Sequence, residues 1–199
     1  MTGLIAGALH RCRLSLTMIV VMAVVSACAS SGGSIEDTMA PVAPVTEKYA
    51  AIVVDAKSGK MLYGANVNEV RYPASLTKMM TLYLMFEAMD EGRVSRSDPI
   101  PISRNAAARP PSKLGLKAGQ SIPVDTAIRV LVVKSANDVA TAVGEFLGGG
   151  SEARFAQMMT AKARTLGMSR TTFKNASGLP DPEQVTTATD MARLSIALR

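Results

Sequence analysis

Histidine, cysteine and tryptophan are almost absent from this 199-residue chain. It has one histidine, His10, two cysteines, Cys12 and Cys28, and no tryptophan. All three of those residues lie in or beside an N-terminal segment with the pattern of an export signal, and its removal leaves no histidine and at most one cysteine. The mature chain then cannot use a Ser-His-Asp or Cys-His mechanism. It cannot build a His/Cys metal site or an internal disulfide either, so a catalytic base must be Lys, Asp, Glu or Tyr.

Clusters of like charge are also lacking. The chain is 48% hydrophobic and 19% charged, which is enough apolar material for a buried core and argues against global disorder. There is no run of Lys and Arg, and aromatic residues make up only 4%. A nucleic-acid partner is therefore not expected. Loss of residues 1–27 lowers the formal net charge from +6 to +4, and a mildly basic surface suits an anionic cell envelope.

The N-terminal segment has the three parts of a signal peptide. Arg11 and Arg13 precede the apolar run LSLTMIVVMAVV, and small residues follow it. The run is too short to span a bilayer comfortably. Its end, Val25-Ser26-Ala27-Cys28, also resembles a bacterial lipobox. We therefore expect a signal peptide over 1–27 and a lipidated Cys28 as the first mature residue, with ordinary cleavage after Ala29 as the alternative.

Composition divides the remaining chain into a tether and one domain. Residues 28–46 are rich in Ser, Gly, Pro and Ala, have no hydrophobic period, and are predicted to form a flexible tether. The domain covers 47–199. Its predicted elements are a hairpin over 50–64, a helix from Pro73 to Met89, an irregular excursion over 93–123, helices over 125–134, 137–147 and 152–166, a loop over 173–185, and a last helix from Thr187 to the end at Arg199.

Ser75 and Lys78 open the predicted apolar helix. Residues three apart share a helix face, and a serine becomes a nucleophile when a nearby base takes its proton. A lysine serves as that base when burial lowers its pKa. The alternative is a cap-like serine beside a lysine whose charge reaches solvent. Lys78 lies within the apolar run MMTLYLMF, where an idle charge would be costly to bury, and this favours the catalytic interpretation.

Ser135 and Asn137 lie at the junction of two predicted helices. A hydroxyl and an amide two residues apart can point into one cleft, where the serine would relay a proton and the amide would hold a substrate backbone. Taken alone, this pair is more simply explained as the N-cap of the helix that starts at 137. The two motifs together, Ser-x-x-Lys and about sixty residues later Ser-x-Asn, are a far more specific signal.

The motifs and their surroundings resemble the low-molecular-mass penicillin-binding proteins that are serine-type D-alanyl-D-alanine carboxypeptidases. The resemblance rests on the stretches YPASLTKMMTLYLMFEAM, KSANDVATAVGEFLGG and FAQMMTAKARTLGMSRTTFKNASGLPD, and runs from about residue 47 to residue 199. It implies an α+β fold of the β-lactamase and DD-peptidase type. In that fold an antiparallel sheet packs against helices, and the cleft lies beside a helical subdomain.

The resemblance also implies roles for individual residues. Ser75 is the nucleophile that forms an acyl-enzyme with the penultimate D-alanine, and Lys78 is its general base. Ser135 passes a proton to the leaving D-alanine, and Asn137 holds the substrate backbone. The implied partners are peptidoglycan stem peptides ending in D-Ala-D-Ala and β-lactam inhibitors, with membrane attachment through Cys28. No cofactor or metal is implied, and the location is the periplasm or the outer face of the envelope.

Two features depart from the family pattern. Met159-Thr160 stands where the family usually has Met-Asn, and no Lys-Thr-Gly, the family's third motif, occurs in the sequence. That motif normally supplies a carboxylate-binding lysine and the second oxyanion N–H, so we expect the domain over 47–199 to be incomplete at its C-terminus. An inactive, truncated or degenerate chain that only binds wall peptide therefore stays an alternative.

A β-lactamase is the less favoured alternative. Class A enzymes hydrolyse the acyl-enzyme with a water held by a glutamate, usually within Glu-x-x-x-Asn. The glutamates after Asn137 are Glu145, Glu152 and Glu183, and none of them has that context.

Overall fold

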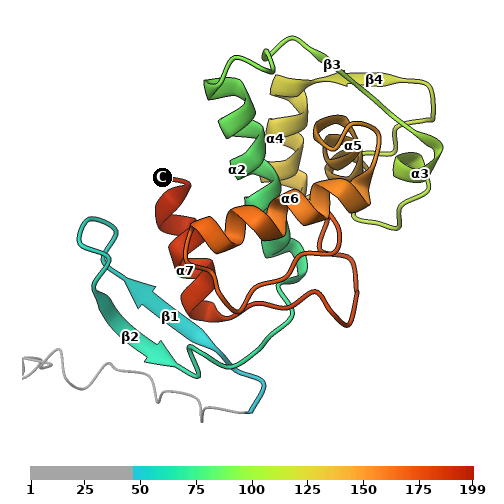
Figure 1. The fold of residues 1–199 in the computed structure, drawn as a ribbon. Coiled ribbons are helices and arrows are strands. Elements are labelled where there is room, and N and C mark those ends of the chain that lie inside the picture. The colour runs from blue at the N-terminus through green and yellow to red at the C-terminus, as the bar shows by residue number, and fades with distance from the viewer. Residues whose placement is uncertain (1–46) are drawn as a thin grey trace, which may run out of the picture. The chain divides into compact units, whose positions relative to one another are not determined.

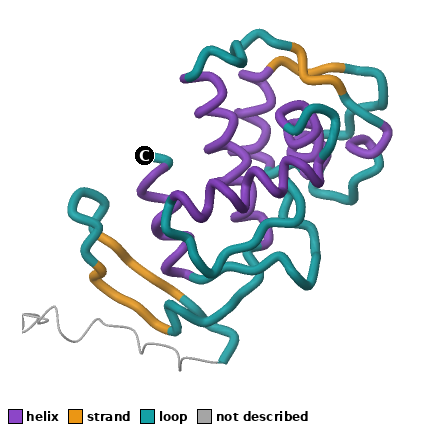
Figure 2. The backbone as a smooth tube through the Cα atoms, in the orientation of Figure 1, coloured by secondary structure: helices purple, strands orange, loops and turns teal. Residues whose placement is uncertain are grey.

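A computed structural model describes residues 47–199. Its elements are β1 (Ala51–Val54), β2 (Met61–Ala65), the 3₁₀ turn η3 (Ala74–Leu76), α2 (Thr77–Asp90), β3 (Pro99–Pro101), α3 (Arg104–Ala107), β4 (Ser121–Pro123), α4 (Val124–Lys134), α5 (Asn137–Leu147), α6 (Glu152–Thr165) and α7 (Ala188–Ala197). Figure 1 shows α2, α4, α5 and α6 grouped together, and β1 and β2 beside α7. Helices and antiparallel strands thus occur together, as the α+β prediction requires (Figure 2).

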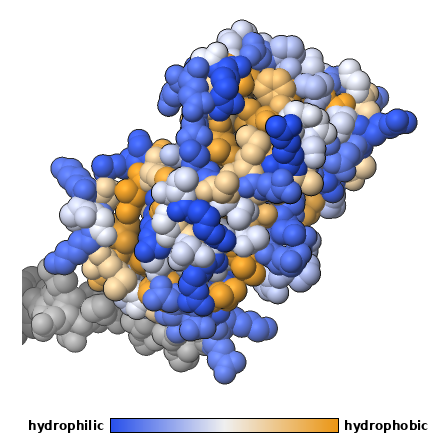
Figure 3. Space-filling view, in the orientation of Figure 1, coloured by the Kyte–Doolittle hydropathy of each residue, from blue (hydrophilic) through white to orange (hydrophobic). Residues whose placement is uncertain are grey.

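The predicted hairpin is confirmed. β1 and β2 pair antiparallel, with Ile52 opposite Gly64 and Val53 opposite Tyr63. The Asp55 carboxylate closes the turn by accepting hydrogen bonds from the backbone N–H and the hydroxyl of Ser58, both at 2.7 Å. Apolar and aromatic side chains of the hairpin remain on the surface, since Val53, Met61, Leu62 and Tyr63 are all at least 41% exposed. Figure 3 shows hydrophobic surface over the hairpin.

Helix α2 is buried on most of its sides, as its apolar sequence predicts. One row of its side chains, including Met85 and Ala88, packs with α4 and α5 in a first core. Another row, including Met80 and Leu84, packs with α6 and α7 in a second core. Because α2 contributes to both cores, the helix lies between two groups of helices.

The excursion over 93–123 contains short regular pieces. Strands β3 and β4 pair around Ile100 and Ile122, which are both buried. The buried Asp138 carboxylate accepts the backbone N–H groups of Leu114 and Gly115 at 2.9 and 2.8 Å. A charged acceptor thus holds this part of the loop by its backbone N–H groups, although the loop has no regular structure and Leu114 is 40% exposed.

Most predicted helix bounds are accurate. Helix α5 has the predicted bounds, α4 starts one residue earlier, and α6 ends one residue earlier. The prediction for α7 is wrong at both ends, because Thr187 caps the helix from outside and the helix ends at Ala197. The Thr187 hydroxyl accepts the N–H of Asp190, and this capping role explains why the helix begins one residue later than predicted.

The predicted signal peptide over 1–27, the tether over 28–46 and the lipidation site Cys28 lie outside the described residues. Within 47–199, every helix is too short or too polar to cross a membrane.

We predict that Phe155→Ala will lower the free energy of unfolding by about 3–5 kcal/mol, because Phe155 is fully buried in the second core. Val133→Ala is the control, since Val133 is 87% exposed and its loss should cost less than about 0.5 kcal/mol. Urea unfolding followed by circular dichroism measures both. Equal costs for the two variants would contradict this description of the core.

Candidate active site

The turn before α2 presents Ser75 to solvent. Ala74 lies in the left-handed region with φ 46°, and Ser75 follows it within η3. No side-chain cap is made at the start of η3 or of α2, so the interpretation of Ser75 as a cap-like serine is wrong. A non-glycine residue in the left-handed region is strained. The fold therefore places Ser75 at the surface, directly after the strained residue Ala74.

Lys78 is buried one turn further along, with 3% of its surface exposed. Its Nζ lies 3.4 Å from Ser75 Oγ and donates hydrogen bonds to Asn137 Oδ1 at 3.0 Å and to the carbonyl oxygen of Ser177 at 2.6 Å. All three partners are neutral. Burial disfavours the ammonium and lowers the pKa of Lys78 to about 8. A sizeable fraction of this lysine is therefore neutral near physiological pH.

Asn137 contacts Lys78 instead of capping its helix. The N-cap of α5 is Ala136, with no side-chain hydrogen bond, so the simple capping interpretation of Asn137 is wrong. The side-chain oxygen of Asn137 accepts from Lys78, and its amide donates to the carbonyl oxygen of Pro110 at 3.0 Å. The amide is thus fixed in one orientation, with its oxygen toward the lysine.

Ser135 ends α4 in the left-handed region, with φ 55°. Its hydroxyl has no hydrogen-bond partner among residues 47–199. The chain reverses there and runs directly into α5, which brings Ser135 within two residues of Asn137. The structure therefore brings Lys78 into direct contact with Ser75 and Asn137 and places Ser135 two residues before Asn137, without a hydrogen bond to Lys78.

Sequence reasoning missed the contribution of the loop over 173–185. Its Ser177 carbonyl makes the shortest contact to Lys78 Nζ, although the two residues are 99 positions apart. Asn175 Oδ1 accepts the backbone N–H groups of Ser177 and Gly178 at 3.2 and 2.7 Å and thereby fixes the turn. The only local sign in the sequence is this Asn followed three residues later by Gly, a combination typical of turns.

Thr160 replaces the usual asparagine of the family and anchors the start of that loop. Its hydroxyl accepts the N–H of Phe173 at 3.0 Å and contacts the carbonyl oxygen of the same residue at 3.2 Å. The departure at position 160 is therefore accommodated by a local pair of hydrogen bonds.

Gly178 lies directly against the turn that carries Ser75. It has φ +85°, and a Cβ placed on it would come 1.8 Å from the carbonyl oxygen of Ala74 and 3.1 Å from the N of Ser75. Only glycine allows this approach of one backbone to the other. The loop and the turn are consequently fitted to each other.

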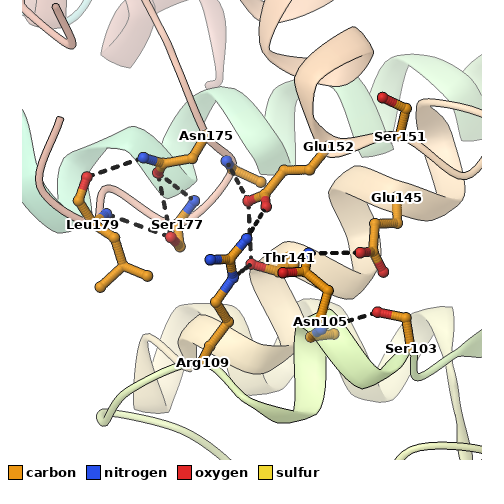
Figure 4. A network of polar contacts seen from close by, with 12 residues as sticks. Ser103, Asn105, Arg109, Thr141, Glu145, Ser151, Glu152, Asn175, Ser177 and Leu179 are labelled. Carbon is orange, nitrogen blue, oxygen red and sulfur yellow. Dashed lines mark hydrogen bonds and ion pairs between the residues drawn. The ribbon is translucent and has the colours of Figure 1, made fainter.

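A second polar network holds the same loop through the backbone of Ala176 (Figure 4). Glu152, Arg109 and Thr141 form it, and the Glu152 carboxylate accepts the N–H of Ala176 at 3.1 Å. Among residues 47–199, no group of three His, Cys, Asp or Glu side chains could hold a metal ion.

The comparisons with known proteins agree with these motifs. The family model described as D-alanyl-D-alanine carboxypeptidase matches residues 37–199. This chain belongs to that family. The carboxypeptidase DacF of Bacillus subtilis is 38% identical over 146 residues, which are 73% of this chain and 37% of that protein.

Solved structures support the fold. The carboxypeptidase DacD of Francisella tularensis superposes with a TM-score of 0.73 at 37% identity, over 79% of this chain and 38% of that one. Penicillin-binding protein D2 of Listeria monocytogenes, in its cefotaxime-bound form, has a TM-score of 0.65 at 34% identity, over 75% of this chain and 60% of that one. The predicted family and fold class are confirmed. The chain spans about two-fifths of the length of DacF and of DacD.

We predict that Gly178→Ala will destabilise the protein more than Gly92→Ala. Both glycines have positive φ, but a Cβ at Gly92 meets nothing within 4 Å, whereas a Cβ at Gly178 meets the backbone of Ala74. The left-handed penalty of about 1–2 kcal/mol is common to both, so the excess loss at Gly178 measures its contact with the backbone of Ala74. Urea unfolding gives both values, and equal losses would refute the close fit.

Proposed function

We propose that the chain provides the nucleophile and general base of a serine-type D-Ala-D-Ala carboxypeptidase that removes the terminal D-alanine from peptidoglycan stem pentapeptides. The observation that carries this proposal is the distance of 3.4 Å between Ser75 Oγ and Lys78 Nζ, a buried lysine whose hydrogen-bond partners are all neutral. Its pKa of about 8 suits a base that must accept a proton and return it near neutral pH.

The reaction proceeds in two halves. Neutral Lys78 accepts the hydroxyl proton while Ser75 Oγ attacks the carbonyl carbon of the penultimate D-alanine. The C–N bond then breaks as the proton held by Lys78 passes through the Ser135 hydroxyl to the nitrogen of the leaving D-alanine, and an ester remains on Ser75. Water hydrolyses that ester, and the proton it releases restores the Ser75 hydroxyl. Asn137 orients the substrate backbone next to Lys78.

β-Lactams are the inhibitors expected of this chemistry. Attack by Ser75 opens the ring amide, and the leaving nitrogen stays tethered to the acyl group, so it does not diffuse away as D-alanine does. The cefotaxime-bound form of the Listeria monocytogenes relative is consistent with this expectation.

A second candidate is a chain that binds wall peptide without turning it over. The 199 residues contain no Lys-Thr-Gly, the motif to which the family resemblance assigns the carboxylate-binding lysine and the second oxyanion N–H. A β-lactamase remains less favoured, because Glu145, Glu152 and Glu183 bond to Asn105, Arg109 and Lys174, respectively.

We predict that a fluorescent penicillin will label Ser75. Ser75→Ala should abolish labelling, because the acylated oxygen is removed, and Lys78→Ala should slow labelling by about three orders of magnitude or more. Ser151→Ala and Lys162→Ala are the controls, since Ser151 caps α6 and Lys162 pairs with Glu87. Undiminished labelling of Ser75→Ala would contradict the assignment.

The labelling rate should rise with pH and level off above about pH 8, since only neutral Lys78 accepts the proton. Between pH 8 and pH 6 the neutral fraction of Lys78 falls about fifty-fold, and the labelling rate should fall with it.

A separate assay distinguishes the two candidate functions. It compares the 199-residue chain with a reading frame extended through a Lys-Thr-Gly motif, and D-alanine release is measured for both. Release by the extended frame alone would assign turnover to that motif and favour peptide binding for the shorter chain.

We propose further that the protein is exported and anchored in the envelope through acyl chains on Cys28, each buried CH₂ contributing about 0.8 kcal/mol. We predict that intact mass of the membrane fraction will show a mature chain beginning at diacylated Cys28, and that Cys28→Ser will prevent this modification. A soluble, unmodified chain beginning at Ser30 would establish ordinary cleavage instead.

A further inference from the structure

The two stronger oxygen contacts of Lys78 come from outside its own helix. Asn137 Oδ1 and the Ser177 carbonyl lie 3.0 and 2.6 Å from Nζ, whereas Ser75 Oγ lies at 3.4 Å. The position of the ammonium therefore depends on whatever fixes those two oxygens.

Each oxygen depends in turn on a neighbouring backbone segment. The Asn137 amide is oriented by the carbonyl oxygen of Pro110. The Ser177 carbonyl follows Ala176, whose own carbonyl accepts from Thr81 at 2.7 Å and whose N–H donates to Glu152 Oε1 at 3.1 Å. Pro110 and Ala176 are thus the two points from which the surroundings of Lys78 are held.

One ion pair links these two points. Arg109, next to Pro110, donates through Nη2 to Glu152 Oε2 at 2.5 Å, while the other oxygen of Glu152 holds Ala176. Thr141 completes the unit, because its hydroxyl donates to Glu152 at 3.1 Å and accepts from Arg109 Nε at 3.2 Å (Figure 4). The Glu152 side chain is 10% exposed and that of Arg109 is 29% exposed, so solvent screens this pair only partly.

We propose that Arg109 and Glu152 are positioning residues for Lys78: their ion pair ties the Pro110 segment to the Ala176 segment and so keeps Asn137 and the Ser177 carbonyl closed around the lysine Nζ. This inference deepens the proposed function, in which Lys78 is the base. Neither residue touches Lys78 or Ser75, and both act through backbone segments.

Loosening this unit should let water reach Lys78. Burial is what lowers the pKa of Lys78, so hydration of Nζ should move that pKa back toward the ordinary lysine value. For each unit by which the pKa of Lys78 rises, about nine-tenths of the neutral lysine present at pH 7 is lost. A purely structural ion pair elsewhere in the domain would not change this titration.

Titration of ¹³C-labelled lysines in the 199-residue chain by NMR tests the proposal, with the Lys78 signal assigned as the one absent from Lys78→Ala. In Glu152→Ala, which lacks the acceptor for Ala176 and the partner of Arg109, we expect the Lys78 pKa to rise by at least one pH unit. Glu152→Gln keeps an acceptor oxygen and should rise less. Should Glu152→Ala fail to fold, Glu152→Gln against wild type decides the question.

Glu87→Ala is the matched control. Glu87 of α2 pairs at 2.5 Å with Lys162 of α6, the helix that also carries Glu152, and the two side chains are 27% and 25% exposed. Removal of this pair therefore perturbs α6 without touching the loop over 173–185. Its Lys78 titration should match wild type. An unchanged Lys78 pKa in folded Glu152 variants, or an equal rise in Glu87→Ala, would overturn the proposal. Because no activity is measured, a wild-type chain that penicillin fails to label would refute the proposed function and leave this test intact.

Discussion

The buried ammonium of Lys78 is the constraint on which the arrangement of this domain depends. A charged group removed from water and given no counter-ion is costly, and folded proteins usually pair it with a carboxylate. Here the hydrogen-bond partners are a hydroxyl, an amide oxygen and a main-chain carbonyl. Neutral oxygens partly replace hydration without favouring the protonated form as strongly as a carboxylate would. The lysine can therefore be solvated by protein and still release its proton near neutral pH.

This solution requires distant segments to meet at one nitrogen atom. The amide comes from the start of α5, and the carbonyl comes from the loop over 173–185, 99 residues after Lys78. The loop must also approach the Ala74 backbone so closely that only Gly178 fits there. Strain at Ala74 and at Ser135, both in the left-handed region, accompanies this convergence. Such conformations persist only where the surrounding structure over-determines them, and the hydrogen bonds of Asn175 and Thr81 are part of that surrounding structure.

The sequence predicted what depends on local pattern. Gly148-Gly149-Gly150 ends α5 where expected, and the apolar run after Lys78 correctly indicated a helix buried on most sides. The Ser-x-x-Lys spacing also predicted the pairing of Ser75 with Lys78. The contacts of Ser177 and Glu152 could not be predicted, because a backbone carbonyl has no sequence signature and a lone glutamate at a helix start is ordinary. Asn137 contacts Lys78 and does not cap α5, and this too could not be predicted, because the orientation of its amide depends on the tertiary position of Pro110.

The two cores explain why a lysine can be buried at this place. Side chains of α2 alternate between a core with α4 and α5 and a core with α6 and α7, so α2 lies between the two groups of helices. At that junction the buried space is lined by loop backbone and helix ends, whose polar groups need hydrogen-bond partners. A cation with three donors satisfies several of them at once. The same junction leaves the preceding turn at the surface, which places an exposed serine directly beside a buried base.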